Sequence, residues 1–346
     1  MPSPWKALPR WLRIAIVILV AVPSATLTCF SRAAARRERL SNTAAAPSSG
    51  RFVQTADAAM FVQEDGPSDG PPVVLIHGTG AWSEIWRGTM RSLAARGYHA
   101  VALDMPPFGY SSRPAIPNFS DDAQGRRILG VLEALRLEHV TLVGHSFGAR
   151  PTMQAAFLAP ARVSAVVLVD AALGLDTTLE SSGPGPATRV LLAVKPLRDP
   201  LVAATLTNPA MTRRLLMRLI AETSAATPER VQMLQQPFVV EGTTERFGEW
   251  LRPFVTTNEL SLATRRASYA SLKVPALVIW GALDSLTPLE QGRDLARLIP
   301  GASLTELPRA GHIPAIEDPS GFDQALLLFL DANVSHSATG MPRTRR

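Results

Sequence analysis

The chain has 346 residues, of which 46% are hydrophobic and 18% are charged; this is globular usage for one large α/β domain and excludes disorder throughout. The net charge is +6, but residues 1–49 carry +6 and residues 332–346 carry +3, which leaves −3 for the body. A slightly acidic body has no basic surface for nucleic acid, so we expect no nucleic-acid partner.

The chain begins with a basic and then apolar segment. Lys6, Arg10 and Arg13 precede an apolar run over residues 14–22, and no further charge occurs before Arg32. A signal peptide has such a basic start and apolar core, whereas a membrane-spanning helix needs about 17–25 mostly apolar residues. The pattern favours a retained transmembrane anchor over a cleaved signal or a buried core helix. It predicts a membrane-associated protein, or an exported one if the segment is cleaved.

Small and polar residues separate this segment from the body. Residues 40–51 are rich in Ala, Ser and Pro, which is typical of a flexible linker. Residues 1–51 are therefore assigned to the anchor or signal plus linker, and residues 332–346 to a basic disordered tail. Cys29 is the only cysteine, which excludes an intramolecular disulfide and a cysteine-based zinc site.

Short apolar runs alternate with helical patterns along the body. Strands are predicted at residues 73–76, 100–104, 140–144, 163–170, 276–280 and 303–307. Helices are predicted at residues 83–95, 121–137, 147–158, 288–298 and 319–330. Most of the strand runs are continuously apolar, as in a parallel sheet that is covered on both faces. The alternation predicts a doubly wound, mostly parallel α/β sheet.

One long interval breaks this alternation. About 100 residues follow the strand that ends near Asp170, and helical patterns at residues 211–220 and 228–234 replace strands there. A structureless loop of that length is improbable in a compact domain. We predict a helical lid over residues 172–272, inserted between core parts at residues 52–171 and 273–331.

Residues 144–148 form the pentapeptide G-x-S-x-G around Ser146. The pentapeptide follows a predicted strand and opens a predicted helix. A sharp strand-turn-helix junction needs glycines where the two elements approach, and it exposes the serine hydroxyl at the carboxyl edge of the sheet. The context, more than the pentapeptide, predicts a nucleophilic serine.

With these motifs in order, residues 52–331 resemble the α/β-hydrolase superfamily. The matching segments are residues 77–80, 104–111, 144–148, 280–284 and 310–312. They occur in the family's order of serine, acid and histidine. The resemblance is to the branches with a lid, which include esterases, lipases and carbon–carbon-bond hydrolases. Pro107 departs from the family, which usually has glycine there.

The resemblance implies a catalytic triad. Ser146 is the nucleophile, His312 the general base, and Asp284 the acid that orients the histidine. The backbone N–H groups of Thr79 and Phe147 form the oxyanion hole by the same resemblance. No cofactor or metal is predicted, since no metal cluster, P-loop or dinucleotide motif is present in the sequence.

Several other residues remain open. Asp170 also ends a strand and is the rival for the acid. His77 and His145 are expected to brace the loops beside them, and His99 is expected at the surface. The two tryptophans Trp82 and Trp86 line an acyl pocket or pack in the core.

Three functions compete on this basis. The first is hydrolysis of small or medium, partly apolar carboxylic esters through an acyl-serine intermediate. The alternative is cleavage of a carbon–carbon bond in a vinylogous 1,5-diketone from ring cleavage. A non-catalytic binding protein, or a cofactor-free haloperoxidase-like activity, is the third.

Overall fold

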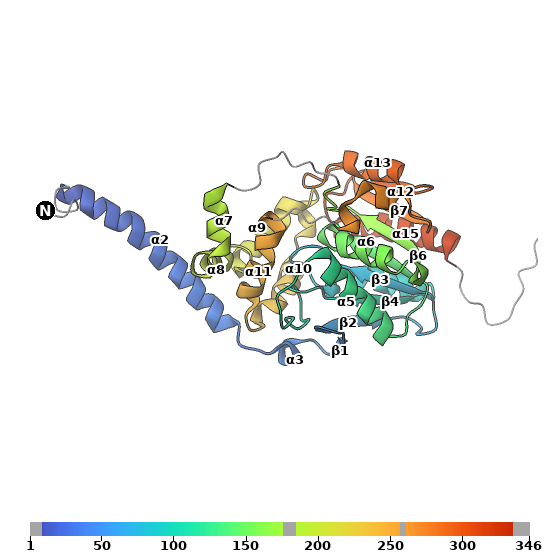
Figure 1. Cartoon of the computed structure of the whole chain (residues 1–346), viewed down its shortest axis with the longest axis horizontal. Coiled ribbons are helices and arrows are strands. Elements are labelled where there is room, and N and C mark those ends of the chain that lie inside the picture. Colours follow the sequence, from blue (N-terminus) through green and yellow to red (C-terminus); the bar gives the residue numbers. More distant parts are fainter. Residues whose placement is uncertain (1–8, 176–184, 257–260, 335–346) are drawn as a thin grey trace, which may run out of the picture.

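The computed structural model has one mixed sheet with helices on both faces (Figure 1). It describes residues 9–175, 185–256 and 261–334, without the side chains of residues 13–18, 20 and 254–256. Within this part of the chain the sheet has eight strands in the order β1-β2-β4-β3-β5-β6-β7-β8. The strands are β1 (Gly50–Gln54), β2 (Ala59–Asp65), β3 (Pro72–Ile76), β4 (His99–Leu103), β5 (Val140–His145), β6 (Val163–Val169), β7 (Ala276–Gly281) and β8 (Ser303–Leu307).

The six predicted strands are confirmed, and with them the predicted doubly wound, mostly parallel α/β sheet. They are β3 to β8, and neighbours among them pair in parallel. β1 and β2 were not predicted from the sequence; they pair antiparallel with each other, and β2 pairs antiparallel with β4. β1 lies at the sheet margin and mixes polar with apolar residues, so it lacks the continuous apolar run of a central strand.

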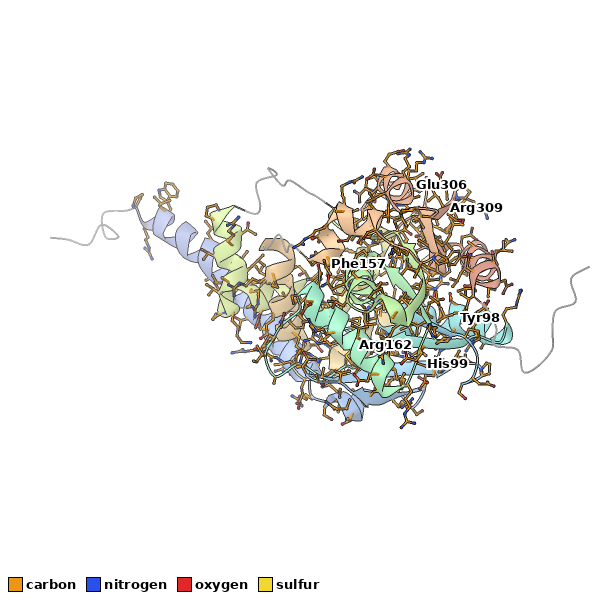
Figure 2. The ribbon with its side chains drawn as sticks, turned by 45° about the vertical axis from the view of Figure 1, so that its right-hand side comes forward. Tyr98, His99, Phe157, Arg162, Glu306 and Arg309 are labelled. Atoms are coloured by element: carbon orange, nitrogen blue, oxygen red, sulfur yellow. The ribbon has the colours of Figure 1, made fainter. Side chains whose placement is uncertain are left out.

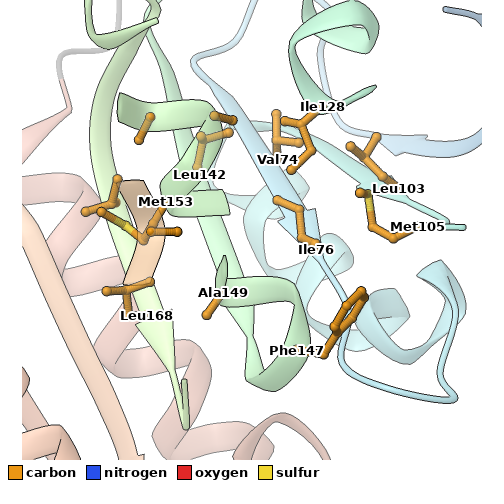
Figure 3. Packing of buried hydrophobic residues seen from close by; sticks show 14 of the residues in the cluster. Val74, Ile76, Leu103, Met105, Ile128, Leu142, Phe147, Ala149, Met153 and Leu168 are labelled. Carbon is orange, nitrogen blue, oxygen red and sulfur yellow. The ribbon is translucent and has the colours of Figure 1, made fainter. Parts of the chain in front are cut away.

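Alternate residues of each central strand face opposite sides of the sheet. Val74 and Ile76 lie in one apolar cluster together with Met153 (Figure 3), whereas Val73 and Leu75 lie in another. The first face is covered by α5 (Asp121–Ala134), α6 (Ala149–Leu158) and α13 (Leu289–Leu298), and the second by α4 (Arg87–Ala95) and α15 (Pro319–Asn333). Burial on both faces is the reason that these strands are apolar throughout.

The interval between β6 and β7 is helical. It contains α7 (Pro186–Ala193), α8 (Lys195–Ala204), α9 (Pro209–Leu219), α10 (Pro228–Gln235), α11 (Thr243–Thr256) and α12 (Arg266–Ala270). We call α7 to α11 the helical insertion. Its side chains Leu216, Ile220 and Leu234 pack against Ala81 and Ile313 of the core. This apolar contact holds the insertion over the carboxyl ends of the strands.

Short helices complete the described chain. They are α3 (Asn42–Ala45), α14 (Pro314–Glu317), η1 (Ser83–Trp86), η2 (Ser146–Gly148), η3 (Pro160–Arg162), η4 (Thr223–Ala225), η5 (Gln236–Val239) and η6 (Leu262–Thr264). The predicted helices correspond to η1 with α4, α5, η2 with α6, α13 and α15. The predicted basic tail lies outside the described residues from residue 335 onward, and α15 extends to Asn333.

The N-terminal segment forms a long helix, α2 (Arg10–Arg37), that projects from the body beside α8 (Figure 1). Its end is joined to the insertion, because Glu38 accepts a hydrogen bond from the Thr244 backbone at 3.0 Å. The Arg37 side chain donates to the Phe238 carbonyl at 3.1 Å. Among the described residues, no helix combines the length and the apolar character needed to cross a membrane.

The expected flexible linker lies against the core instead. The Asn42 side chain donates to the carbonyls of Tyr110 and Ser111 at 2.8 and 2.9 Å. Leu40 forms an isolated bridge with Val240 of the insertion. This segment therefore has defined contacts that its small, polar composition did not indicate.

Candidate active site

Ser146 is the first residue of η2, at the junction between β5 and α6, and its backbone is strained. Its φ is 51°, a left-handed value that costs a non-glycine residue about 1–3 kcal/mol. A Cβ at Gly144 would lie 2.8 Å from the Ala149 Cα, and one at Gly148 would lie 2.5 Å from the His77 carbonyl oxygen. The two glycines of the pentapeptide are therefore required by close backbone approach.

Three side chains that are far apart in the chain meet at this junction. The Ser146 Oγ lies 2.7 Å from His312 Nε2, and His312 Nδ1 lies 2.7 Å from Asp284 Oδ2. The serine is 6% exposed and the histidine 2% exposed. Each residue follows the carboxyl end of a parallel strand, β5, β7 or β8, where open α/β sheets place their ligands. The structure thus brings together the three residues that the sequence singled out.

Asp284 is held by its own turn. Its Oδ1 accepts hydrogen bonds from the backbones of Leu286 at 2.7 Å and Thr287 at 3.0 Å, and its Oδ2 accepts one from the Thr287 hydroxyl at 2.5 Å. Burial alone would raise the pKa of Asp284, but its hydrogen bonds and the nearby His312 outweigh burial and lower the pKa below its ordinary value. Asp284 is therefore a carboxylate at neutral pH.

Asp170, the rival acid, lies beside the same group. Its carboxylate, Asp284 and His312 approach one another within 4.8 Å, but the Asp170 Oδ1 accepts from the Gly281 backbone at 2.9 Å. Burial, and the neighbouring Asp284 among other causes, raise the pKa of Asp170 well above its ordinary value. His312 therefore bonds the ionised carboxyl of Asp284, and Asp170 ties β6 to β7.

Two other histidines brace the site. His145 donates from Nε2 to the His312 carbonyl at 2.7 Å, and burial lowers its pKa to about 3. His77 accepts from the Met105 backbone at 2.9 Å and donates to the Gly78 carbonyl at 2.8 Å. Burial lowers the pKa of His77 to about 4, so both imidazoles are neutral at pH 7.

The loop after β3 lies directly against Ser146. A Cβ at Gly78 would lie 2.7 Å from His145 Nδ1 and 3.1 Å from the Ser146 Cβ. Thr79 comes next in this loop and is exposed, while Phe147 follows Ser146 and is buried. Of the two predicted oxyanion-hole residues, Thr79 therefore follows Gly78, which lies against the serine Cβ, and Phe147 follows the serine itself.

Both tryptophans after this loop are buried. Trp82 donates from its indole to the Met233 carbonyl at 2.8 Å and packs edge-on against Tyr110. Trp86 packs edge-on against His145. These contacts favour a packing role for both residues over an acyl pocket.

A cleft of about 770 Å³ begins at Phe147. Its lining includes four basic and two acidic side chains, namely Arg150, Lys195, Arg198, Arg252, Asp121 and Glu249, together with Trp250 and Pro253 of α11. Three of the basic side chains are paired with carboxylates, Arg150 with Asp121 and both Lys195 and Arg198 with Asp199. The cleft was not predicted from the sequence, because its residues come from segments far apart in the chain, namely the loop before α5, the start of α5, η2, α6, α8 and α11.

Two positions of the site were not predicted from the sequence. Thr287 donates a hydrogen bond to the Asp284 carboxylate. The spacing D-x-x-T is typical of a turn that an aspartate side chain closes, so this residue could have been predicted. The Glu317 carboxylate accepts hydrogen bonds from the backbone N–H groups of Gly311 and Ile313, on either side of His312. Its other partners, Ala221 and Glu222, lie in the helical insertion, so no short sequence motif predicts the role of Glu317.

Known proteins resemble the chain along most of its length. Residues 71–319 match the family model described as alpha/beta hydrolase fold. A 2-hydroxymuconate semialdehyde hydrolase from Pseudomonas putida is 29% identical over 297 residues, which cover 84% of this chain and 98% of that protein. A 2-hydroxy-6-oxononadienedioate/2-hydroxy-6-oxononatrienedioate hydrolase from Paraburkholderia phymatum is 30% identical over 262 residues, or 75% of this chain and 86% of that protein.

A solved structure agrees with these relatives. The meta-cleavage product hydrolase from Pseudomonas fluorescens matches with a TM-score of 0.67 and 26% identity, over 82% of this chain and 98% of that chain. None of these three names refers to an ester. The comparisons thus favour the carbon–carbon-bond alternative over the ester hydrolysis that the motifs suggested first.

Proposed function

The chain belongs to the α/β-hydrolase fold family, and from that premise we propose that it is a serine hydrolase that cleaves a carbon–carbon bond beside a ketone in an acidic dienoate. The observation that carries the serine-hydrolase part of this proposal is the hydrogen-bonded series of Ser146, His312 and Asp284, with 2.7 Å at each step. Such a series is the arrangement that activates a hydroxyl as a nucleophile.

The substrate reacts as its keto tautomer, a vinylogous 1,5-diketone. Ser146 attacks the ketone carbon and its proton passes to His312 Nε2. The tetrahedral adduct collapses, the carbon–carbon bond breaks, and its electrons pass through the conjugated double bond onto the second ketone to give a dienolate. That fragment takes the proton from His312, and an acyl group remains on the serine. A water molecule, deprotonated by His312, then releases the acyl group as an acid. One water is consumed overall.

The supporting residues have separate tasks. Asp284 accepts the Nδ1–H of His312, fixes its tautomer and stabilises the imidazolium. The backbone N–H groups of Thr79 and Phe147 stabilise the oxyanion, and losing one such donor costs roughly 3 kcal/mol in the barrier. His145 supports the His312 loop from behind through its bond to the His312 carbonyl.

One observation supports an acidic dienoate over a neutral ester. The relatives named above are hydrolases of a muconate semialdehyde and of oxo-dienedioates. Ester hydrolysis uses the same steps with an alcohol as leaving group, so it is the second candidate.

A direct comparison of substrates tests the proposal. Purified protein is given 2-hydroxymuconate semialdehyde and, separately, p-nitrophenyl butyrate, and kcat/KM is measured for each. We expect the dienoate to have the higher value, and the Ser146→Ala variant to lose both activities. A higher value for the ester would make the protein an esterase and reject carbon–carbon cleavage.

We also propose that the N-terminal segment attaches the protein to a membrane surface. The apolar run at residues 14–22 directly follows Arg13, the next basic residue is Arg32, and Trp11, Leu19 and Val22 of α2 are exposed. Exposed apolar and basic side chains together favour an anionic lipid surface. Co-flotation with vesicles that contain an anionic lipid is expected for the full chain but not for a chain without residues 1–37. Equal flotation of the two would contradict this.

A further inference from the structure

The Glu317 carboxylate, at the end of α14, accepts hydrogen bonds from four backbone N–H groups. Its Oε2 accepts from Ala221 at 2.7 Å, from Glu222 at 3.0 Å and from Gly311 at 2.9 Å. Its Oε1 accepts from Ile313 at 2.9 Å. A carboxylate has about four sites that can accept a hydrogen bond, so these four donors occupy all of them.

The four donors belong to two segments that are far apart in the chain. Gly311 and Ile313 are the two neighbours of His312, and Ala221 and Glu222 follow α9 in the helical insertion. The backbone N–H of His312 donates to the carbonyl of Leu219, the last residue of α9, at 3.0 Å. The histidine loop is therefore bonded to the insertion directly and through Glu317.

The space between these segments is closed to side chains. A Cβ at Gly311 would lie 2.6 Å from the Ala221 backbone nitrogen and 3.2 Å from Glu317 Oε2. On either side of the carboxylate, Ile313 and Ile316 pack in one apolar cluster with Leu216 of the insertion. Packing thus holds the two segments at the distance that the shared carboxylate requires.

We propose that Glu317 is a positioning residue, which fixes the loop of His312 so that its imidazole faces Ser146 and anchors the end of α9 to that loop. The proposal rests on the proposed function of this site as a serine hydrolase. A general base acts only within hydrogen-bond reach of its proton, and a displacement of about 1 Å can lower a rate roughly a hundredfold.

The experiment compares Glu317→Gln with Glu290→Gln. The amide keeps the size of the side chain but presents an NH₂ group to N–H donors that need an acceptor. Glu290 is the matched control, since its side chain is 73% exposed and paired with Arg293 on the surface of α13. The readouts are the rate at which a fluorophosphonate labels Ser146, and kcat and KM for p-nitrophenyl butyrate.

For Glu317→Gln we expect labelling and kcat to fall by about ten- to a hundredfold, with KM unchanged within about threefold. Glu290→Gln should stay within about twofold of the unaltered chain. Labelling of Glu317→Gln at the unaltered rate would overturn the positioning role and leave the proposed function intact. Failure of the unaltered chain to label would instead overturn the proposed function, and the positioning role with it.

Hydrogen exchange of the unaltered protein decides the matter if Glu317→Gln does not fold. The amides of Ala221 and Glu222 are surface amides, so their protection depends on the carboxylate. We expect them to exchange at least tenfold more slowly than the amides of other exposed loops. Exchange at the rate of an open loop would overturn the anchor.

Discussion

At the residue scale, the site depends on the protonation states of its buried groups, which their surroundings set. Asp284 is ionised because its turn supplies three hydrogen bonds in addition to that of His312. His77 and His145 are neutral because burial removes them from water. One ionised partner beside His312 and neutral imidazoles behind it fix where the proton of Ser146 can go.

Thr287→Val tests the support of the acid. The change removes the hydroxyl that donates to Asp284 Oδ2 and preserves the shape of the side chain. A hydrogen bond to a charged group contributes about 1.5–3 kcal/mol, so we expect kcat to fall roughly tenfold or more. Thr205→Val, at the exposed residue that follows α8, is the control and should leave kcat unchanged. Equal kcat values in the two variants would contradict the role.

His77 gives the folded protein a pH dependence. Its folded pKa of about 4 lies below its ordinary 6.5, so its stabilising contribution is complete above pH 6.5 and is lost as the pH falls toward 4. Between pH 7.5 and 5.5 this loss is about 1.4 kcal/mol of unfolding free energy. We expect His77→Gln to lose that much less than the unaltered chain over this range in urea unfolding. His139→Gln, at an exposed residue, should not differ from the unaltered chain.

The residues of the triad could be predicted because each lies in a motif that follows a predicted strand. His99 was predicted at the surface and this was wrong. It is 6% exposed and contacts Glu64 at 3.0 Å, where β4 begins beside Tyr98 (Figure 2). Glu64, the partner of His99, lies on β2, and β2 pairs with β4. Because β2 was not predicted, this contact could not be predicted either.

At the element scale, the strand-turn-helix junction is the feature that the sequence predicted best. Its glycines are explained by close contacts with backbone atoms. β1 and β2 were missed because antiparallel strands at a sheet margin need no continuous apolar run. The helices of the insertion were predicted only in part, since their apolar faces fit the core and carry no chemical motif.

Gly148→Ala tests this junction. The new Cβ would lie 2.5 Å from the His77 carbonyl oxygen and 2.8 Å from an Ile76 methyl group, so the backbone must shift. We expect the unfolding free energy to fall by about 1–3 kcal/mol, and Ser146 labelling to slow. Gly88→Ala in α4 meets open space and should keep or slightly raise stability. Equal stability of the two variants would contradict the close-approach argument.

At the scale of the whole molecule, the insertion connects the N-terminal helix to the catalytic loops. One end of the insertion is bonded to the His312 loop, and another accepts the end of α2 through Glu38 and Arg37. Motif order predicted the fold because parallel strands bring their carboxyl ends to one edge. The contacts of the insertion could not be predicted, since they join segments about 100 to 200 residues apart.

Glu38→Gln tests the connection to α2. The Glu38 carboxylate is 7% exposed and accepts from both the backbone and the hydroxyl of Thr244. We expect the free energy of opening at the Thr244 amide, measured by hydrogen exchange, to fall by about 1–3 kcal/mol. Glu138→Gln, with a 54% exposed side chain paired to Arg162, should cause no change there. An unchanged Thr244 amide in Glu38→Gln would show that the carboxylate does not hold the insertion.

The central claim is that Ser146 is a nucleophile activated by His312. Mass spectrometry of the intact protein after treatment with a fluorophosphonate tests it most directly, with the modified peptide sequenced by fragmentation. One added phosphonyl group on Ser146 is predicted, with none on Ser146→Ala and a greatly slowed reaction for His312→Asn. No modification of the unaltered chain, or modification of Ser146→Ala to the same extent, would contradict the account.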